Sequence, residues 1–191
     1  MKSQSYFCPF LLILFVIIVN SCNSKNNNQV EDNYKKEIEK AIIRIERENN
    51  SRKVKNQYMY FGTDSTIKIE LKQFLSTKRL FLYFSSNTCS PCIERTVEII
   101  KEVLPSYIKN EKIVFLSPDY PARFRNNFYG KKLLMLENRK LGIPIENEES
   151  PPFFIIVNYD MEVESIHVVN KMDFDRTVDY LKEMTKNFDF K

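Results

Sequence analysis

The chain has 191 residues and a formal charge of +4, a size that suits one ordinary domain. Three glycines are too few for a phosphate-cradling loop, and a single histidine, His167, excludes metal sites that need several imidazoles. The 29 basic and 25 acidic residues are largely interspersed, so the charge gives no argument for a nucleic-acid partner.

The first 21 residues are typical of a lipoprotein signal peptide. Lys2 gives a positive start, and the apolar run Phe7–Val19 is shorter than the roughly 20 residues that a membrane-spanning helix needs. The following Asn20-Ser21-Cys22 resembles a bacterial lipobox, which implies that Cys22 carries the lipid. We therefore expect the protein in the cell envelope, lipid-anchored to a bacterial membrane and facing the periplasm or the exterior. An uncleaved signal anchor is the alternative.

Two connecting segments are expected before the domain. Residues 22–33 are polar and poor in apolar side chains, as a flexible tether is. Residues 34–56 contain apolar positions at helical spacing, which predicts an amphipathic helix that acts as a spacer or packs on the domain. The domain itself is expected to cover residues 57–191.

The first half of the domain predicts a β-hairpin followed by a strand–helix–strand unit. The expected strands are Gln57–Phe61, Thr66–Leu71, Leu80–Phe84 and Lys112–Leu116. The apolar run at residues 80–84 is typical of a strand covered on both faces. An apolar stripe from Ile93 to Leu104 predicts the helix, which Pro105 ends. This order favours a parallel crossover.

The second half is less regular. Tyr120–Tyr129 predicts a short helix, and Leu133–Leu136 fits either a short strand or a helical turn. Phe153–Val157 is the strongest strand signal in the chain, with a partner strand expected over Glu162–Val169. Asp173 is the expected N-cap of a last helix.

Cys89 and Cys92 are the two cysteines that remain when Cys8 is removed with the signal peptide and Cys22 is lipidated. They form a Cys-x-x-Cys pair at the end of a buried strand and the start of a helix. The unpaired NH groups and the positive dipole end of a helix stabilise a thiolate, so the pKa of Cys89 should be lowered. Cys89 is then the attacking nucleophile, and Cys92 resolves the mixed disulfide. Pro91 fits the first helical turn without loss of a hydrogen bond.

The hairpin, the apolar strand into Cys-x-x-Cys, the helix behind it and a proline before a late strand together resemble the thioredoxin-like fold. The resemblance is closest to the membrane-tethered, extracytoplasmic thiol-disulfide oxidoreductases of bacteria. It implies an α/β, three-layer fold with a central mixed sheet, preceded by the hairpin and the amphipathic helix. It also implies a cis-proline that faces the disulfide and orients the client backbone. Pro151 is the candidate because it leads into the late strand, with Pro152 as a minor alternative. Pro144 is less suitable, since no core strand follows it.

Several positions depart from the family pattern. The chain has no tryptophan, and Tyr83 stands where thioredoxin has a buried acid. Glu94 and Glu98 could replace that acid, although glutamates on a helix surface are usually solvated. Ser90-Pro91 between the cysteines leaves the direction of electron flow open.

We therefore expect an enzyme that exchanges thiols and disulfides with client proteins and with an unidentified membrane or periplasmic redox partner. No cofactor, metal or nucleic acid is expected. A structural disulfide is an alternative, although so short a loop would restrict the unfolded chain little. The same fold could instead serve a copper chaperone that uses His167, or a binding module that does not need its cysteines.

Overall fold

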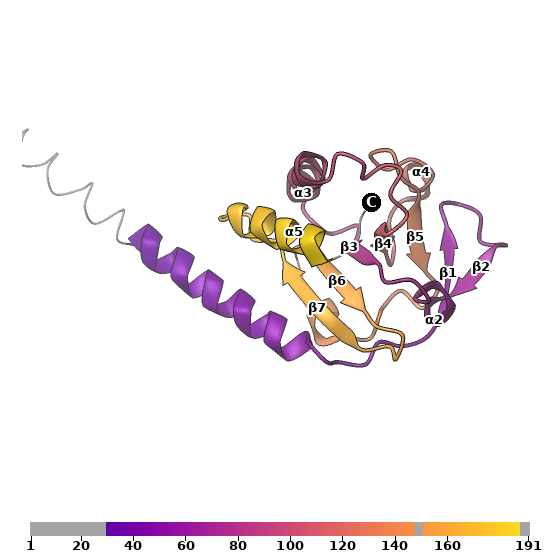
Figure 1. Ribbon diagram of the computed structural model, residues 1–191, viewed down its shortest axis with the longest axis horizontal. Coiled ribbons are helices and arrows are strands. Elements are labelled where there is room, and N and C mark those ends of the chain that lie inside the picture. Colours follow the sequence, from indigo (N-terminus) through magenta and orange to yellow (C-terminus); the bar gives the residue numbers. More distant parts are fainter. Residues whose placement is uncertain (1–29, 148–150, 188–191) are drawn as a thin grey trace, which may run out of the picture. The chain divides into compact units, whose positions relative to one another are not determined.

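The structure is a computed structural model that describes residues 30–147 and 151–187 (Figure 1). It divides into two compact units, Met1–Ala41 and Ile42–Lys191. The predicted signal peptide and the predicted lipidation site, Cys22, lie outside the described residues. Within the described part of the chain, no helix has both the length and the apolar character needed to cross a membrane.

Residues 30–49 form a helix. It begins four residues before the predicted start, so positions 30–33 of the expected tether are helical. Glu31 and Asp32 in the first turn stabilise the positive end of the helix dipole, and Glu31 pairs with Lys35 at 3.0 Å. The last turns belong to the second unit, where Ile42 is buried and the Asn49 side chain accepts a hydrogen bond from the Ile145 NH at 3.1 Å. The compact unit therefore starts before residue 57.

The second unit is built on a seven-stranded mixed sheet in the order β2-β1-β5-β4-β3-β6-β7. The strands are β1 (Tyr58–Phe61), β2 (Lys68–Glu70), β3 (Leu80–Tyr83), β4 (Ile113–Ser117), β5 (Leu133–Leu136), β6 (Phe153–Val157) and β7 (Val163–Val168). Strands β3, β4 and β5 are parallel to one another, and β6 is antiparallel to β3. The predicted hairpin and the parallel crossover are both confirmed.

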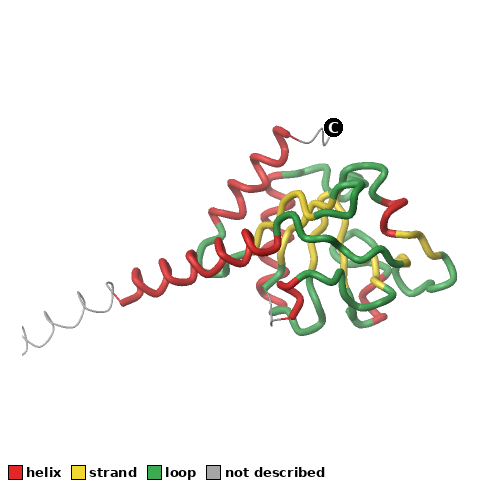
Figure 2. The backbone as a smooth tube through the Cα atoms, turned by 90° about the horizontal axis from the view of Figure 1, so that it is seen from below, coloured by secondary structure: helices red, strands yellow, loops and turns green. Residues whose placement is uncertain are grey.

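Helices and loops cover both faces of the sheet (Figures 1 and 2). The helical segments of this unit are α2 (Leu71–Phe74), α3 (Ser90–Val103), α4 (Ala122–Arg125), η1 (Pro144–Asn147) and α5 (Asp175–Asn187). Helices α3 and α5 lie together on one face, where Leu82, Val97 and Leu181 are part of one buried apolar cluster. On the other face, Phe74 of α2 packs on Phe81 with ring centroids 6.1 Å apart. The three-layer α/β prediction is confirmed.

Leu133–Leu136, for which the sequence allowed a strand or a helical turn, is strand β5. It pairs in parallel with β4 and antiparallel with β1, so it joins the N-terminal hairpin to the central strands. All four of its residues are buried. The short helix expected over Tyr120–Tyr129 is limited to α4, and α5 begins two residues after Asp173, whose carboxylate accepts a bond from the Arg176 NH at 3.4 Å.

The strand register determines what lies beside the cysteines. Tyr83, the last residue of β3, pairs with Phe153, the first residue of β6, and Phe153 pairs in turn with Val168 at the end of β7. Because Cys89 follows β3, the segment before β6 and the segment after β7 lie at the same edge of the sheet.

Candidate active site

A tight turn leads from β3 to the first cysteine. The Thr88 NH donates to the Ser85 carbonyl at 3.1 Å, and the buried Thr88 hydroxyl oxygen accepts the Ser85 NH at 3.0 Å. A threonine hydroxyl in such a turn satisfies a backbone NH that would otherwise lack a partner. The turn places Cys89 at the N-cap of α3.

The two thiols of the pair differ in exposure. Cys89 is exposed and Cys92 is buried, and both are reduced in this structure. The NH groups of Cys92 and Ile93 donate to the Cys89 carbonyl at 3.0 and 3.1 Å, which closes the first turn of α3. Pro91 lies in that turn, where its missing NH leaves no bond unmade. The exposed thiol can be reached by another protein, whereas the buried one can be reached from Cys89.

Electrostatics separate the two thiols further. Hydrogen bonds from the Cys92 thiol and the Cys92 NH, and the nearby charge of Lys171, lower the pKa of Cys89. Burial raises the pKa of Cys92 to about 11, and the Cys89 sulfur beside it adds to that rise. Cys89 therefore ionises more readily than Cys92.

Asp119 supports the loop before Cys89 from the neighbouring strand. It follows β4, and its carboxylate accepts two hydrogen bonds from Ser86, one from the NH and one from the hydroxyl, both at 2.8 Å. Bonds to an ionised acceptor are stronger than those between neutral groups. The carboxylate therefore fixes the loop that presents the exposed thiol.

A second support comes from the turn after β7. The Val169 NH donates to the Pro152 carbonyl at 3.0 Å, which joins this turn to the start of β6. The buried Asn170 side chain accepts the Met172 NH at 3.0 Å. Lys171 lies between these fixed residues, and this explains why its charge acts on both cysteines.

The two candidate prolines lie where the sequence placed them, directly before β6. The register brings this segment to the edge of the sheet where Cys89 lies. The bond between Pro151 and Pro152 is not cis, so the minor alternative is not found. The bond before Pro151 involves Ser150, which lies outside the described residues, and the orienting role of Pro151 stays a prediction.

A carboxylate lies beside Tyr83, the residue that stands where thioredoxin has a buried acid. Its buried hydroxyl donates to the Glu146 carboxylate at 2.6 Å, and its ring stacks on Phe153 with centroids 4.7 Å apart. Burial and the negative charge of Glu146 raise the pKa of Tyr83. Glu146 also accepts the NH groups of Leu141 and Gly142 at 2.7 Å each. A carboxylate from η1 is thus held against the end of β3.

The glutamates of α3 that could have replaced a buried acid are surface residues. Glu94 and Glu98 are both exposed, and Glu98 pairs with Arg95 at 3.0 Å. Neither replaces a buried acid, and the simpler interpretation of solvated glutamates holds.

His167 belongs to the core between β7 and α5. Its Nε2 lies 3.0 Å from the Thr177 hydroxyl, and its ring stacks on Tyr180 with centroids 4.4 Å apart. Burial and the charge of Arg176 lower its pKa to about 3. Among the described residues, no three His, Cys, Asp or Glu side chains gather as metal ligands would. These contacts give no support to a copper site that uses His167.

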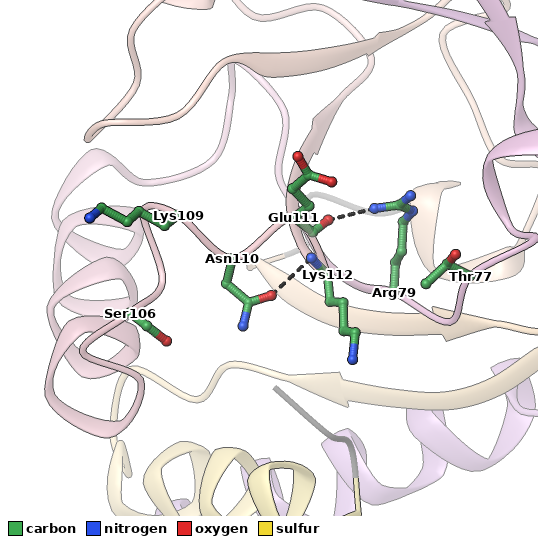
Figure 3. Close-up of a pocket in the computed structure, with 7 residues that line it drawn as sticks. All are labelled: Thr77, Arg79, Ser106, Lys109, Asn110, Glu111 and Lys112. Atoms are coloured by element: carbon green, nitrogen blue, oxygen red, sulfur yellow. Dashed lines mark hydrogen bonds between the residues drawn. The ribbon is translucent and has the colours of Figure 1, made fainter. Parts of the chain in front are cut away.

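A polar cavity of about 370 Å³ lies away from the cysteines (Figure 3). Thr77 and Arg79 precede β3, and Lys112 precedes β4, so this cavity is at the amino ends of the parallel strands. The Arg79 guanidinium donates to the Glu111 carbonyl at 2.6 Å inside it. Cys89 follows the carboxyl end of β3, and the cavity is therefore not part of the thiol site.

The order of the elements decides the fold. A hairpin precedes a buried strand that runs into Cys-x-x-Cys, and a long helix follows. Later in the chain an antiparallel pair of strands completes the mixed sheet, and a final helix ends the unit. The chain has a thioredoxin-like fold. The sequence resemblance was correct in this respect.

The solved structures that resemble this chain share little sequence with it. No family model matches the chain, and no curated protein matches its sequence. An uncharacterized thioredoxin-like protein from Porphyromonas gingivalis is 13% identical, with a TM-score of 0.46 over 73% of this chain and 95% of that one. The C-terminal domain of an uncharacterized protein from Bacteroides fragilis is 21% identical, with a TM-score of 0.45 over 70% and 97%. A thiol:disulfide interchange protein from Bacteroides sp. is 13% identical, with a TM-score of 0.42 over 71% and 91%.

Three residues of the site were not found from the sequence. Asp119 and Lys171 lie in loops that follow strands, Glu146 lies in η1, and no local motif surrounds any of them. Each becomes part of the site through the sheet register. A charged residue two or three positions after a strand was the one signal available, and it applies only to Asp119 and Lys171.

Proposed function

We propose that the protein exchanges thiols and disulfides with client proteins through Cys89 and Cys92. The observation that supports this most is the contrast between the two thiols at the start of α3. One is exposed with a lowered pKa, and the other is buried with a raised pKa. A structural role would not require this contrast.

Acting on a client disulfide, the Cys89 thiolate attacks one client sulfur. A bond forms between the two sulfurs, the client S–S bond breaks, and the second client sulfur leaves as a thiolate that takes up a proton. Cys92 then loses its proton and attacks the Cys89 sulfur, which forms the Cys89–Cys92 disulfide and releases the first client thiol. The client gains two electrons and the protein loses two. The reverse sequence oxidises a client dithiol.

We further propose that this chemistry takes place outside the cytoplasm, on a lipoprotein anchored through Cys22. The lipobox-like Asn20-Ser21-Cys22 and the apolar run before it support this location. Disulfide chemistry on clients fits an envelope compartment, because disulfides persist there. Pro151, at the start of β6, is proposed to orient the client backbone beside Cys89.

Trapping experiments test the assigned roles. The Cys92→Ala variant should accumulate a mixed disulfide between Cys89 and a client, because nothing resolves it. The matched Cys89→Ala variant should trap none. Equal trapping by both variants would contradict the roles, and wild-type protein that forms no Cys89–Cys92 disulfide on mild oxidation would refute the function.

A further inference from the structure

A polar cavity of about 410 Å³ lies beside the thiol site. Pro118 and Asp119, which follow β4, line it together with Glu137 and Arg139, which follow β5. Since β3, β4 and β5 are parallel, this cavity is at the same edge of the sheet as Cys89. Open α/β sheets bind their ligands in the crevice at the carboxyl ends of parallel strands.

Asp119 connects the cavity to the cysteine loop. The carboxylate that lines the cavity is the same one that accepts both hydrogen bonds from Ser86, three residues before Cys89. The cavity therefore borders the loop that presents Cys89 to a client.

The basic side chains that line the cavity are not all paired with carboxylates of the described residues. Lys68 is paired with Glu137. Arg125 donates through Nε to the Tyr120 carbonyl, and no described carboxylate pairs with it. Arg139 has no hydrogen bond or ion pair with any described residue. Asp119 is the remaining acid, and its hydrogen bonds go to Ser86.

The fixed Arg125 side chain leaves its terminal nitrogens for a ligand. Guanidinium groups bind carboxylates through two parallel hydrogen bonds, a geometry that lysine does not provide. The volume is within the range of ligand pockets and larger than one acidic side chain needs. Lys171, which acts on Cys89 from the turn after β7, adds positive charge on another side of the thiol.

We propose that this cavity is a client subsite in which Arg125 and Arg139 bind an acidic side chain close to the reacting cysteine of the client. The proposal rests on the thiol–disulfide function proposed above and gives it a substrate class, namely cysteines with aspartate or glutamate nearby in the chain.

Two peptides test the preference. Each carries one cysteine as a mixed disulfide with thionitrobenzoate, flanked by two glutamates in one peptide and two glutamines in the other. The Cys89 thiolate of the reduced full-length protein attacks the peptide sulfur, and the released thionitrobenzoate is measured by absorbance. We expect the glutamate peptide to react about tenfold faster at low salt.

Arg139→Gln should bring the ratio of the two rates close to one, and Arg125→Gln should lower it. Arg139 is the more direct test, because its side chain holds no part of the described structure. Arg123→Gln, on the same short helix as Arg125 but not lining the cavity, is the matched control and should keep the ratio.

Equal rates for both peptides with the wild-type protein, or a ratio that persists in Arg139→Gln, would overturn the subsite. Free thionitrobenzoate disulfide without a peptide separates this failure from failure of the proposed function. If neither it nor either peptide reacts with Cys89, the thiol–disulfide function is refuted and the subsite with it.

Discussion

The two thiols of the reduced protein should differ in their rate of alkylation at pH 7. The pKa of about 11 for Cys92 leaves about one molecule in 10,000 as the thiolate at that pH. The pKa of Cys89 lies below its ordinary value of 9.0, so at least about one molecule in 100 carries that thiolate. The populations of the reactive form therefore differ by about 100-fold or more.

Intrinsic nucleophilicity reduces this difference. A thiolate of higher pKa attacks faster, with a Brønsted coefficient of about 0.4–0.5, so two pKa units favour the Cys92 thiolate by about eightfold. The balance leaves Cys89 faster by at least about tenfold, before the exposure of Cys89 is considered. The difference comes from the fold and should disappear in urea.

A short pulse of iodoacetamide measures the difference in alkylation rate between Cys89 and Cys92. Trypsin leaves both cysteines in one peptide, Leu80–Arg95, so fragment-ion mass spectrometry must assign the modified residue. The same pulse in urea is the control for the reagent. Modification of Cys92 as fast as Cys89 in the folded protein would refute the asymmetry on which the function depends.

Three further substitutions test individual contacts. Tyr83→Phe should lower the free energy of unfolding by about 1–2 kcal/mol, because Glu146 loses the hydroxyl of Tyr83 but keeps its backbone NH partners. Urea denaturation measures this free energy, and an unchanged value would contradict the contact. Burial lowers the pKa of His167 to about 3, so between pH 6.5 and 3 the unfolded chain binds a proton that the folded protein does not. The free energy of unfolding should therefore decrease as the pH is lowered from 6.5 to 3, by up to about 5 kcal/mol. His167→Leu should make the free energy of unfolding less dependent on pH in this range. Lys171→Met should raise the pKa of Cys89 and slow its alkylation at pH 7, and an unchanged pH profile would exclude the electrostatic role.

The central strands were predictable from sequence because they are buried on both faces. Phe153–Val157 and the run before the cysteines are continuous apolar segments of strand length, flanked by prolines or turn residues. Leu133–Leu136 is also continuous and apolar, but four residues fit a helical turn equally well. Its identity as β5 depends on pairing with β4 and β1, which lie far away in the sequence.

The same distinction applies to the site. Cys89 and Cys92 are one helical turn apart, so local spacing was sufficient to join them. Asp119 reaches the cysteine loop across 33 residues, and Glu146 reaches Tyr83 across 63. Such contacts arise from sheet register rather than from any local pattern, and a single sequence does not contain the register.

The asymmetry of the thiols also orders the two steps of the exchange. Burial is the first cause of the raised pKa of Cys92, and the Cys89 sulfur, through its hydrogen bond and its charge, is the second. A mixed disulfide with a client removes the negative charge from Cys89, so the second cause falls away once a client is bound. Cys92 then ionises more easily than in the free protein, and its attack follows capture of the client rather than competing with it.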